Sequence, residues 1–376
     1  MAVMDVEAGT LLTPEGVRER ARLKLEGAGS LYVETVIAPG FADAHAHPQV
    51  VDVGEGLWSN SYEWMSKRRL RVDEAALRAD IDLSSRLAEA SMLRALLEGV
   101  TLMALVGRAE ANLLAYRRMP VKPRVVVMPT ILDVMRGWPT TWSAANLVIS
   151  LSHLDSRVPM GLFVHSLGGV SSKALRAAYV TARSFNLPFG LHLNEGLDEL
   201  HQLVTLLGLR EGEDSGIIAV HCIVDGDFER YGIRVVHCPL SNLRLYGRTL
   251  ADPTKVDALG SDWPLLLGSA LSTYRGAVRV HGKEHASLLL AKATWGGYEV
   301  YGVPWSGDWV GFDEPLERVL KGEAEPSFVA VAGRIVVEER RLLGYGYDRS
   351  DVDRLVDELV KLAIEKHPAE TVIQQA

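Results

Sequence analysis

The chain has 376 residues, 48% of them hydrophobic, and a formal net charge of −8 at pH 7. This length suits a barrel of about 250 residues with an appended domain. The excess of acidic residues argues against nucleic acid or an anionic membrane as the main partner. Residues 1–7 lack the pattern of a signal peptide, and no apolar run is long enough to span a bilayer. Because Cys222 and Cys238 do not form a disulfide framework, we expect a cytoplasmic protein.

The first predicted element is an alternating stretch over residues 17–34, typical of a half-buried antiparallel strand. A similar pattern covers residues 327–337, with Gly333-Arg334 where a hairpin turn is expected. These segments lie at opposite ends of the chain. Together they predict a small β-sandwich domain formed from both termini, residues 1–38 and 311–345.

The middle of the chain alternates between short apolar runs and amphipathic stretches. After a strand that ends at His45, seven further runs cover residues 100–106, 124–130, 158–165, 189–193, 217–221, 233–237 and 256–259. Helical patterns cover residues 83–97, 172–185 and 198–207. Continuous apolar strands are typical of a parallel sheet buried on both faces.

Eight such strands alternating with helices predict an α/β fold, a (β/α)8 TIM-type barrel over residues 39–310. A doubly wound open sheet is the alternative, although no glycine-rich phosphate-binding motif follows the first strand. Helical periodicity over residues 351–364 predicts that residues 346–376 form a C-terminal helix and tail.

Polar residues able to bind a metal or move protons stand at the ends of several predicted strands. His45 and His47 end the first, and side chains two residues apart in a strand point the same way. Later strand ends supply His192, Glu195, His221, His237 and Asp262. The carboxyl ends of barrel strands converge on one site, so we expect these side chains to gather there.

Five motifs in this order resemble the amidohydrolase superfamily: PGFADAHAHP (39–48), HLNE (192–195), AVHC (219–222), VVHCPLSNLRL (235–245) and ALGSD (258–262). The sequence is most similar to the aminohydrolase/chlorohydrolase branch, which includes cytosine, guanine and S-adenosylhomocysteine deaminases and triazine hydrolases. GRIVVEERRL (333–342) also resembles the C-terminal β segment of that family. In place of the family's usual Gly-x-x-Ala-Asp run, however, this chain has GDWVGF (307–312), which leaves the completeness of the β domain open.

The resemblance implies one divalent metal ion held by four ligands, His45, His47, His192 and Asp262. It implies that Glu195 is the acid/base and that His221 holds the metal-bound water and stabilises developing charge. Asp262 also has a catalytic role, since it can take the proton of that water. Neutral imidazoles and a carboxylate suit Zn²⁺, with Fe²⁺ as the alternative. Water on such an ion has a pKa near 7, which makes hydroxide available at neutral pH.

Dinuclear relatives carry a bridging lysine at the end of the fourth strand, and this strand ends instead at residues 162–166 without one. One metal is therefore expected. His165 becomes a candidate substrate contact, with a hydrogen-bonded core histidine as the alternative. His237 is left outside the metal set, and Ser241 and Asn242 are expected to brace the site.

Loops after the strands are expected to form the substrate pocket. The predicted substrate-binding residues are Gln49, Arg136, Trp138, His165 and Asn242. Further tryptophans in these loops are Trp58, Trp64, Trp142 and Trp263. Aromatic walls suit a flat heterocycle, and Arg136 suits a carboxylate or phosphate, but packing or a subunit interface would also explain the tryptophans.

The sequence thus predicts a metal-dependent hydrolase, a deaminase that hydrolyses an exocyclic amino group of a purine- or pyrimidine-like heterocycle through a metal-bound hydroxide. The alternative is a cyclic amide, imidazolone or chlorotriazine hydrolase using the same site. More remote alternatives are a non-catalytic barrel relative and a small-ligand sensor. The expected partners are a small heterocyclic substrate and a second copy of the chain in a homodimer.

Overall fold

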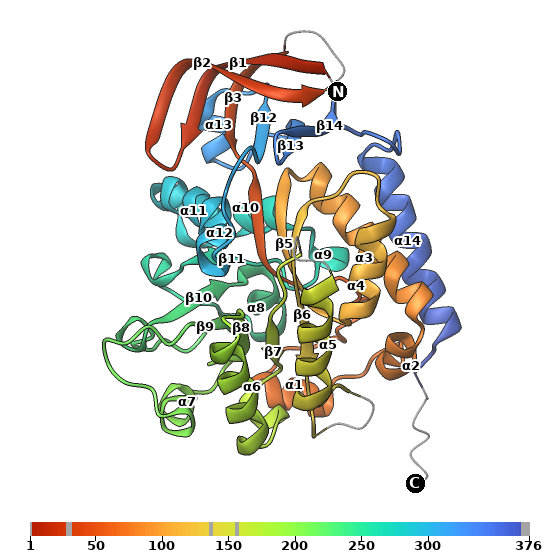
Figure 1. Cartoon of the computed structure of the whole chain (residues 1–376), viewed down its shortest axis with the longest axis vertical. Helices are drawn as coiled ribbons and strands as arrows, with labels where there is room; N and C mark the ends of the chain where they lie inside the picture. Colours follow the sequence, from red (N-terminus) through yellow and green to blue (C-terminus); the bar gives the residue numbers. More distant parts are fainter. Residues whose placement is uncertain (1, 28–31, 135–137, 155–157, 370–376) are drawn as a thin grey trace.

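The computed structural model describes residues 2–27, 32–134, 138–154 and 158–369 (Figure 1). Its larger part is a sheet of eight parallel strands in sequential order. The strands are β4 (Phe41–Ala46), β5 (Val100–Gly107), β6 (Arg124–Ile131), β7 (Leu162–Val164), β8 (Phe189–Leu193), β9 (Ile217–His221), β10 (Ile233–His237) and β11 (Ala258–Leu259). The predicted barrel is therefore confirmed.

The barrel closes between its first strand and the segment after its last. The Asp262 amide donates to the His45 carbonyl at 2.8 Å, and the His47 amide donates to the Asp262 carbonyl at 2.6 Å. These bonds join β4 to the chain beyond β11, so both ends of the sheet meet where the histidines and the aspartate stand. Closure of the barrel itself brings three of the predicted site residues together.

Two of the predicted strands are shorter than expected. The run over residues 158–165 yields only β7, because Pro159 lacks the amide hydrogen needed for regular ladder pairing. The run over residues 256–259 yields only β11, since the Val256 amide bonds back to Pro253 in a turn.

Helices surround the barrel and cover its rim (Figure 1). Those between or beside the strands are α3 (Ile81–Leu97), α4 (Ala109–Arg118), α5 (Thr141–Leu154), α6 (Ser172–Ser184), α7 (Leu200–Leu207), α8 (Pro239–Tyr246), α10 (Ala270–His281), α11 (Ala286–Ala293) and α12 (Trp295–Tyr301). Shorter helices are α1 (Ser61–Lys67), α2 (Glu74–Ala79), α9 (Pro264–Leu267) and α13 (Leu316–Leu320). Single 3-10 turns cover Leu167–Gly169, Glu229–Tyr231, Pro253–Lys255 and Lys283–His285. The three helices expected from periodicity correspond to α3, α6 and α7.

A second sheet combines both ends of the chain, as predicted. Its strands are β1 (Ala2–Thr13), β2 (Gly16–Gly27), β3 (Tyr32–Pro39), β12 (Trp309–Phe312), β13 (Pro326–Val331), β14 (Arg334–Glu338) and β15 (Arg341–Leu342). Their order is β13-β12-β3-β1-β2-β14-β15, and an additional β13–β14 pairing closes the sheet on itself. The small domain is therefore built from one closed, barrel-like sheet.

The single strand expected over residues 17–34 is wrong. β2 ends at Gly27, and β3 begins at Tyr32 on the opposite side of β1. The hairpin expected over residues 327–337 is confirmed as β13 and β14, which pair antiparallel. The unusual segment 307–312 forms β12, which pairs with both β3 and β13. The small β domain thus has a strand at the position where the sequence departs from the family's usual motif.

The small domain lies at the amino end of the barrel strands, because β3 runs into β4 through Gly40 and the histidines stand at the far end of β4. The C-terminal helix α14 (Arg349–Lys366) lies along α3 (Figure 1). Val352, Val356 and Leu359 bury one face of it, and Arg94 bonds Asp353 at 2.8 Å. Within the described ranges, no helix combines the length and apolar character needed to cross a membrane.

Candidate active site

The carboxyl ends of four barrel strands place six predicted site residues around one point. His45 lies in β4 and His47 directly after it, His192 lies in β8, His221 ends β9, and Glu195 and Asp262 follow β8 and β11. The backbone at this edge is unusual: φ is +75° at His221 and +64° at Asp262. Such conformations are rare for residues other than glycine and concentrate at functional sites.

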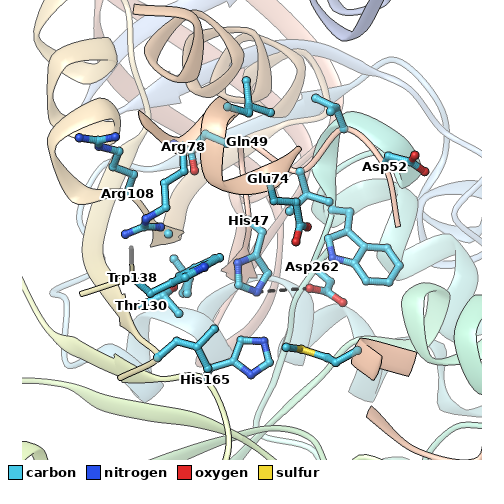
Figure 2. A pocket seen from close by; sticks show the side chains of 18 of the residues that line it. His47, Gln49, Asp52, Glu74, Arg78, Arg108, Thr130, Trp138, His165 and Asp262 are labelled. Carbon is cyan, nitrogen blue, oxygen red and sulfur yellow. Dashed lines mark ion pairs between the residues drawn. The ribbon is translucent and has the colours of Figure 1, made fainter. Parts of the chain in front are cut away.

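Three imidazole nitrogens face one another at the centre of the site. His45 Nε2 lies 3.1 Å from His47 Nε2 and 3.2 Å from His192 Nε2, and the latter two are 3.4 Å apart. Asp262 Oδ1 lies 3.6 Å from the Nε2 atoms of both His45 and His47. One carboxylate thus stands beside two of the three ring nitrogens, and Figure 2 shows its pairing with His47.

This arrangement fits a zinc ion on geometry and on donor chemistry. Two ligand atoms bound to zinc at about 2.0–2.1 Å with a tetrahedral angle are about 3.3 Å apart, which matches the nitrogen separations. Three mutually facing ring nitrogens cannot all hydrogen-bond one another, because a nitrogen that carries a hydrogen cannot also accept a bond, and one without a hydrogen cannot donate. Two groups meet a general spacing criterion for metal binding: His45, His47 and Asp262, and His45, His192 and His221.

Burial keeps these histidines in the neutral form that metals require. It lowers the pKa of His47 to about 3, with the charge of His45 adding to the effect. Burial likewise lowers the pKa of His45 and of His192. For Asp262, burial alone would raise the pKa, but the closeness of His45, His221 and His47 outweighs it and lowers the pKa. Neutral imidazoles beside an ionised carboxylate are the protonation states of a metal site.

Glu195 is a buried carboxylic acid at the edge of this cluster. Its Oε1 accepts a 2.6 Å hydrogen bond from the Tyr246 hydroxyl and lies 3.7 Å from His221 Nε2. Burial raises the pKa of Glu195, although the charge of His221 and the Tyr246 bond oppose this. A carboxyl with a raised pKa can hold and release a proton nearer to neutral pH than a free one.

His221 is held from behind by a chain of polar groups. Its Nδ1 lies 2.7 Å from Asn242 Oδ1, and Asn242 Nδ2 donates to Thr249 Oγ1 at 3.0 Å. Because Oδ1 can only accept, His221 carries its proton on Nδ1 and presents a free Nε2 toward Glu195 and the cluster. Thr249 Oγ1 lies 3.4 Å from His237 Nε2, which lies 3.2 Å from His281 Nε2. His237 thus stands outside the metal cluster, as expected.

Asp43 supports the loop that carries Asp262. Its two carboxylate oxygens accept a hydrogen bond from the Ser261 amide at 2.8 Å and from the Ser269 hydroxyl at 2.7 Å. The carboxyl is fully buried, and burial raises its pKa to about 6 despite these bonds. This contact fixes the backbone next to Asp262, and the sequence contained it as the aspartate of the first motif.

The predicted substrate-binding residues have different positions. Gln49, Trp138 and His165 line the cavity above the cluster. The Gln49 amide also donates to Asn112, and burial lowers the pKa of His165 to about 4. Asn242 is absent from the described lining and lies behind His221 instead. Arg136 lies outside the described residues.

The other loop tryptophans also differ in position, and some line the cavity while others do not. Trp64 and Trp263 line the cavity, whereas the Trp142 side chain is 77% exposed on the surface. Sequence reasoning missed several cavity residues: Met65, Arg68, Glu74, Arg78 and Arg108. Most come from α1 and α2, which are too short to produce a clear helical period. Figure 2 shows Arg78 and Arg108 beside Trp138, across the cavity from Asp262.

No protein-family model matches the chain. A 5'-deoxyadenosine deaminase of Methanococcus maripaludis (strain C7 / ATCC BAA-1331) is 32% identical over 105 residues, which are 24% of this chain and 25% of that protein. The chain therefore matches about a quarter of the length of this relative. A 5-methylthioadenosine/S-adenosylhomocysteine deaminase of Nitratidesulfovibrio vulgaris is 24% identical over 304 residues, covering 70% of this chain and 66% of that protein.

Solved structures with the same fold include two zinc-bound hydrolases. A zinc-bound adenosine deaminase from Xanthomonas campestris superposes with a TM-score of 0.76 at 19% identity, over 96% of this chain and 98% of that one. An atrazine chlorohydrolase from Arthrobacter aurescens, complexed with zinc and atraton, gives a TM-score of 0.77 at 14% identity, over 95% and 100%. The chain thus has the fold of these zinc-bound deaminases and chlorohydrolases, the enzymes that its motifs resemble.

Proposed function

We propose that this chain is a metal-dependent hydrolase that deaminates a purine- or pyrimidine-like heterocycle, replacing an exocyclic amino group with oxygen and releasing ammonia. The observation that carries the proposal is the convergence of three imidazole nitrogens within 3.1–3.4 Å beside Asp262, with the buried Glu195 at the same cavity. The deaminases among the sequence relatives support the reaction type.

We assign the metal ligands as His45, His47, His192 and Asp262, and the metal as a single zinc ion. Zinc bound there supplies a Lewis acid and a water whose pKa is lowered to about 7. The second carboxylate oxygen of Asp262 lies 3.9 Å from His221 Nε2, so both groups face the space above the ligands. Asp262 can accept the proton that the attacking water loses.

Glu195 is the proposed proton donor to the heterocycle. The Tyr246 hydroxyl at 2.6 Å holds the carboxyl in place, and the raised pKa of the carboxyl keeps a proton available for a ring nitrogen. The proton that Asp262 takes from the attacking water is then available for the departing amine. His221 presents Nε2 on the same side, where it can accept a hydrogen bond from the attacking water and, once protonated, donate one to negative charge that develops on oxygen. Gln49, Trp138 and His165 provide the adjoining cavity wall.

Ammonia release is the direct test. Zinc-loaded protein should deaminate at least one member of a panel of nucleobases and nucleosides. The Glu195→Gln variant should keep its metal and lose about a hundredfold or more of the turnover. The Glu63→Gln variant, which changes a surface glutamate paired with Lys67, is the matched control and should keep full activity.

The panel also needs halogenated and cyclic-amide substrates. The fold shared with the atrazine chlorohydrolase supports hydrolysis of a ring–halogen bond as the second candidate function. Release of halide without ammonia would replace the proposed deamination with that reaction. Equal activity of wild type and Glu195→Gln would refute the role of Glu195 in either case.

We further propose that the protein acts in the cytoplasm as a homodimer, on a small heterocyclic substrate. Light scattering of the purified chain distinguishes a dimer from a monomer, and elemental analysis distinguishes zinc from iron. Neither measurement depends on knowing the substrate.

A further inference from the structure

Two arginines on one wall of the cavity have no role in the chemistry described above. Arg78 comes from α2 and Arg108 directly follows β5, and both line the cavity next to Trp138 (Figure 2). The guanidinium carbon of Arg78 lies 4.4 Å from the centroid of the Trp138 ring. This stacking holds the Arg78 side chain against an aromatic face and leaves the edge of the guanidinium, with its N–H donors, available.

The charge of this arginine pair is poorly compensated. Elsewhere on the cavity wall, Arg68 is paired with Glu74, and Asp52 is paired with Arg71 at 3.3 Å. Within the described part of the chain, Arg108 is paired only with Glu110 at 3.9 Å, a side chain that is itself 48% exposed. Among the residues that the structure describes, no carboxylate lies within ion-pair distance of Arg78.

The surroundings make two adjacent cations unfavourable. Burial, with the neighbouring charge of Arg108, lowers the pKa of Arg78 to about 10. A half-buried positive charge without a partner is normally avoided, because desolvation is offset only by an opposite charge or by hydrogen bonds. An anion between the two guanidinium groups would supply both, and planar bidentate bonding suits a carboxylate or phosphate.

The same residues also separate the cavity from a second hollow. Arg78, Arg108 and Trp138 line both spaces, and residues of α2 and α5 together with Glu110, Pro129 and Pro139 line the rest of the outer hollow. The metal cluster and the arginine pair line the same cavity, so a ring bound at the cluster can place a substituent against the arginine pair. A larger substituent would extend toward the outer hollow.

We propose that the substrate carries an anionic group, a carboxylate or a phosphate, on a substituent of its heterocycle, and that Arg78 and Arg108 bind this group. This inference rests on the proposed function for the identity of the reacting ring. Arg78 and Arg108, which lie outside the five motifs, would then determine whether the enzyme prefers a charged or a neutral substrate.

Matched substrate pairs test the proposal and separate the two anions. S-adenosylhomocysteine is compared with 5'-methylthioadenosine for the carboxylate, and adenosine 5'-monophosphate with adenosine for the phosphate. We expect the charged member of at least one pair to be preferred by about tenfold to a hundredfold in kcat/KM, the effect of one hydrogen bond to a charged group.

Substitutions then locate the preference. Arg78→Gln and Arg108→Gln should abolish it mainly through a higher KM for the charged member. Circular dichroism and metal content show whether the variants fold. Arg78→Lys should retain part of the preference because it keeps the charge. The matched control is Arg117→Gln, which changes an exposed arginine near the end of α4 and should leave the preference intact.

Binding measurements keep this inference separate from the proposed function. Calorimetric titration of the same four compounds, of inorganic phosphate and of acetate into the Glu195→Gln protein needs no turnover. Anion binding that is lost in Arg78→Gln supports the inference even if no compound is deaminated. Equal binding of charged and neutral members, or a preference that survives in the double variant Arg78→Gln/Arg108→Gln, would overturn it and leave deamination intact.

Discussion

At the carboxyl end of the barrel, buried Asp262 and Glu195 face imidazoles and a cavity, whereas at the amino end buried Asp308 is enclosed by hydrogen-bond donors. The Asp308 carboxylate accepts bonds from Arg124 Nε at 2.9 and 3.0 Å, from the Ala332 amide at 2.8 Å and from the Ser306 amide at 3.2 Å. Its side chain is fully buried, like those of the site.

The difference lies in what satisfies each carboxylate. Asp308 has a donor for each of its oxygens and joins β6 of the barrel to the small domain. Asp262 has no comparable set of donors. Its carboxylate lies 3.6 Å from ring nitrogens of His45 and His47, which cannot all hydrogen-bond one another and His192. A buried charge whose hydrogen bonds are all made can be accommodated inside a fold, and removing it leaves its donors unpaired. An incompletely satisfied charge at a cavity is typical of a ligand site.

Removing the carboxylate from the site tests this contrast with the largest expected effect. Asp262→Ala should lose bound metal and reduce turnover by about a thousandfold or more, because it removes a ligand and a proton acceptor together. The same change at Asp313, an exposed residue of the other end that contacts Arg340, should affect neither. Metal content by elemental analysis and ammonia release measure both results. An Asp262→Ala protein with a full metal content would contradict the ligand assignment.

Removing the carboxylate from the amino end should instead reduce stability. Asp308→Ala leaves Arg124 and two backbone amides without their acceptor, and we expect it to lower the free energy of unfolding by about 3 kcal/mol. Asp308→Asn keeps an acceptor and should lose less. Urea unfolding followed by circular dichroism gives the difference, and the remaining folded protein should keep its turnover per bound metal. A large loss of turnover in folded Asp308→Ala protein would show that the two ends are coupled.

Between these extremes, the chain behind His221 should affect catalysis without affecting metal content. Asn242→Ala should lower kcat by about tenfold to a hundredfold, as for groups that orient the residues of a metal site. Thr249→Val should have a smaller effect, and Thr249→Ser should restore activity because it keeps the hydroxyl that bonds Asn242. A pH–rate profile unchanged in all three variants, together with unchanged kcat, would argue that this chain is only structural.

At the carboxyl end of the barrel, the strands and the residues that gather at their ends could be predicted from the sequence. The strands are buried on both faces, so continuous apolar runs marked them, and strand ends in a barrel converge whatever their separation in sequence. This is why His45 and Asp262 could be assigned to one site although most of the barrel separates them. The contacts behind the site could not be predicted in this way, because Tyr246 reaches Glu195 across 51 residues with no repeat to indicate it.

Elsewhere the pattern was ambiguous for physical reasons. Alternation of polar and apolar residues continues on both sides of residues 28–31, so it did not show that β2 and β3 are separate strands on either side of β1. The helices α1 and α2 span 7 and 6 residues, fewer than two full turns, so periodicity could not reveal Met65, Glu74 and Arg78, which they bring to the cavity. Trp138 and Trp142 are four residues apart in the sequence. Only the fold shows that Trp138 lines the cavity and that Trp142 is exposed on the surface.

The smallest effect is expected at the far end of α14, where Asp80 receives hydrogen bonds from Lys366 at 2.6 Å and from His367 at 2.9 Å. The bonds from Lys366 and His367 lower the pKa of Asp80. The ionised form is thus favoured in the folded state, and its contribution is present above the unfolded pKa of about 3.9 and is lost as the pH falls below it.

Asp80→Asn isolates this charge, because asparagine can still cap α3 through the Leu83 amide. The variant should be less stable than wild type by less than about 1 kcal/mol at pH 7, the range of surface ion pairs. The difference should be smaller at pH 3, because the unfolded state is then largely protonated, while folded Asp80 keeps its charge down to its lowered pKa. Urea midpoints at the two pH values measure it. An equal difference at both would mean that side-chain shape, and not charge, fixes the end of α14 against the start of α3.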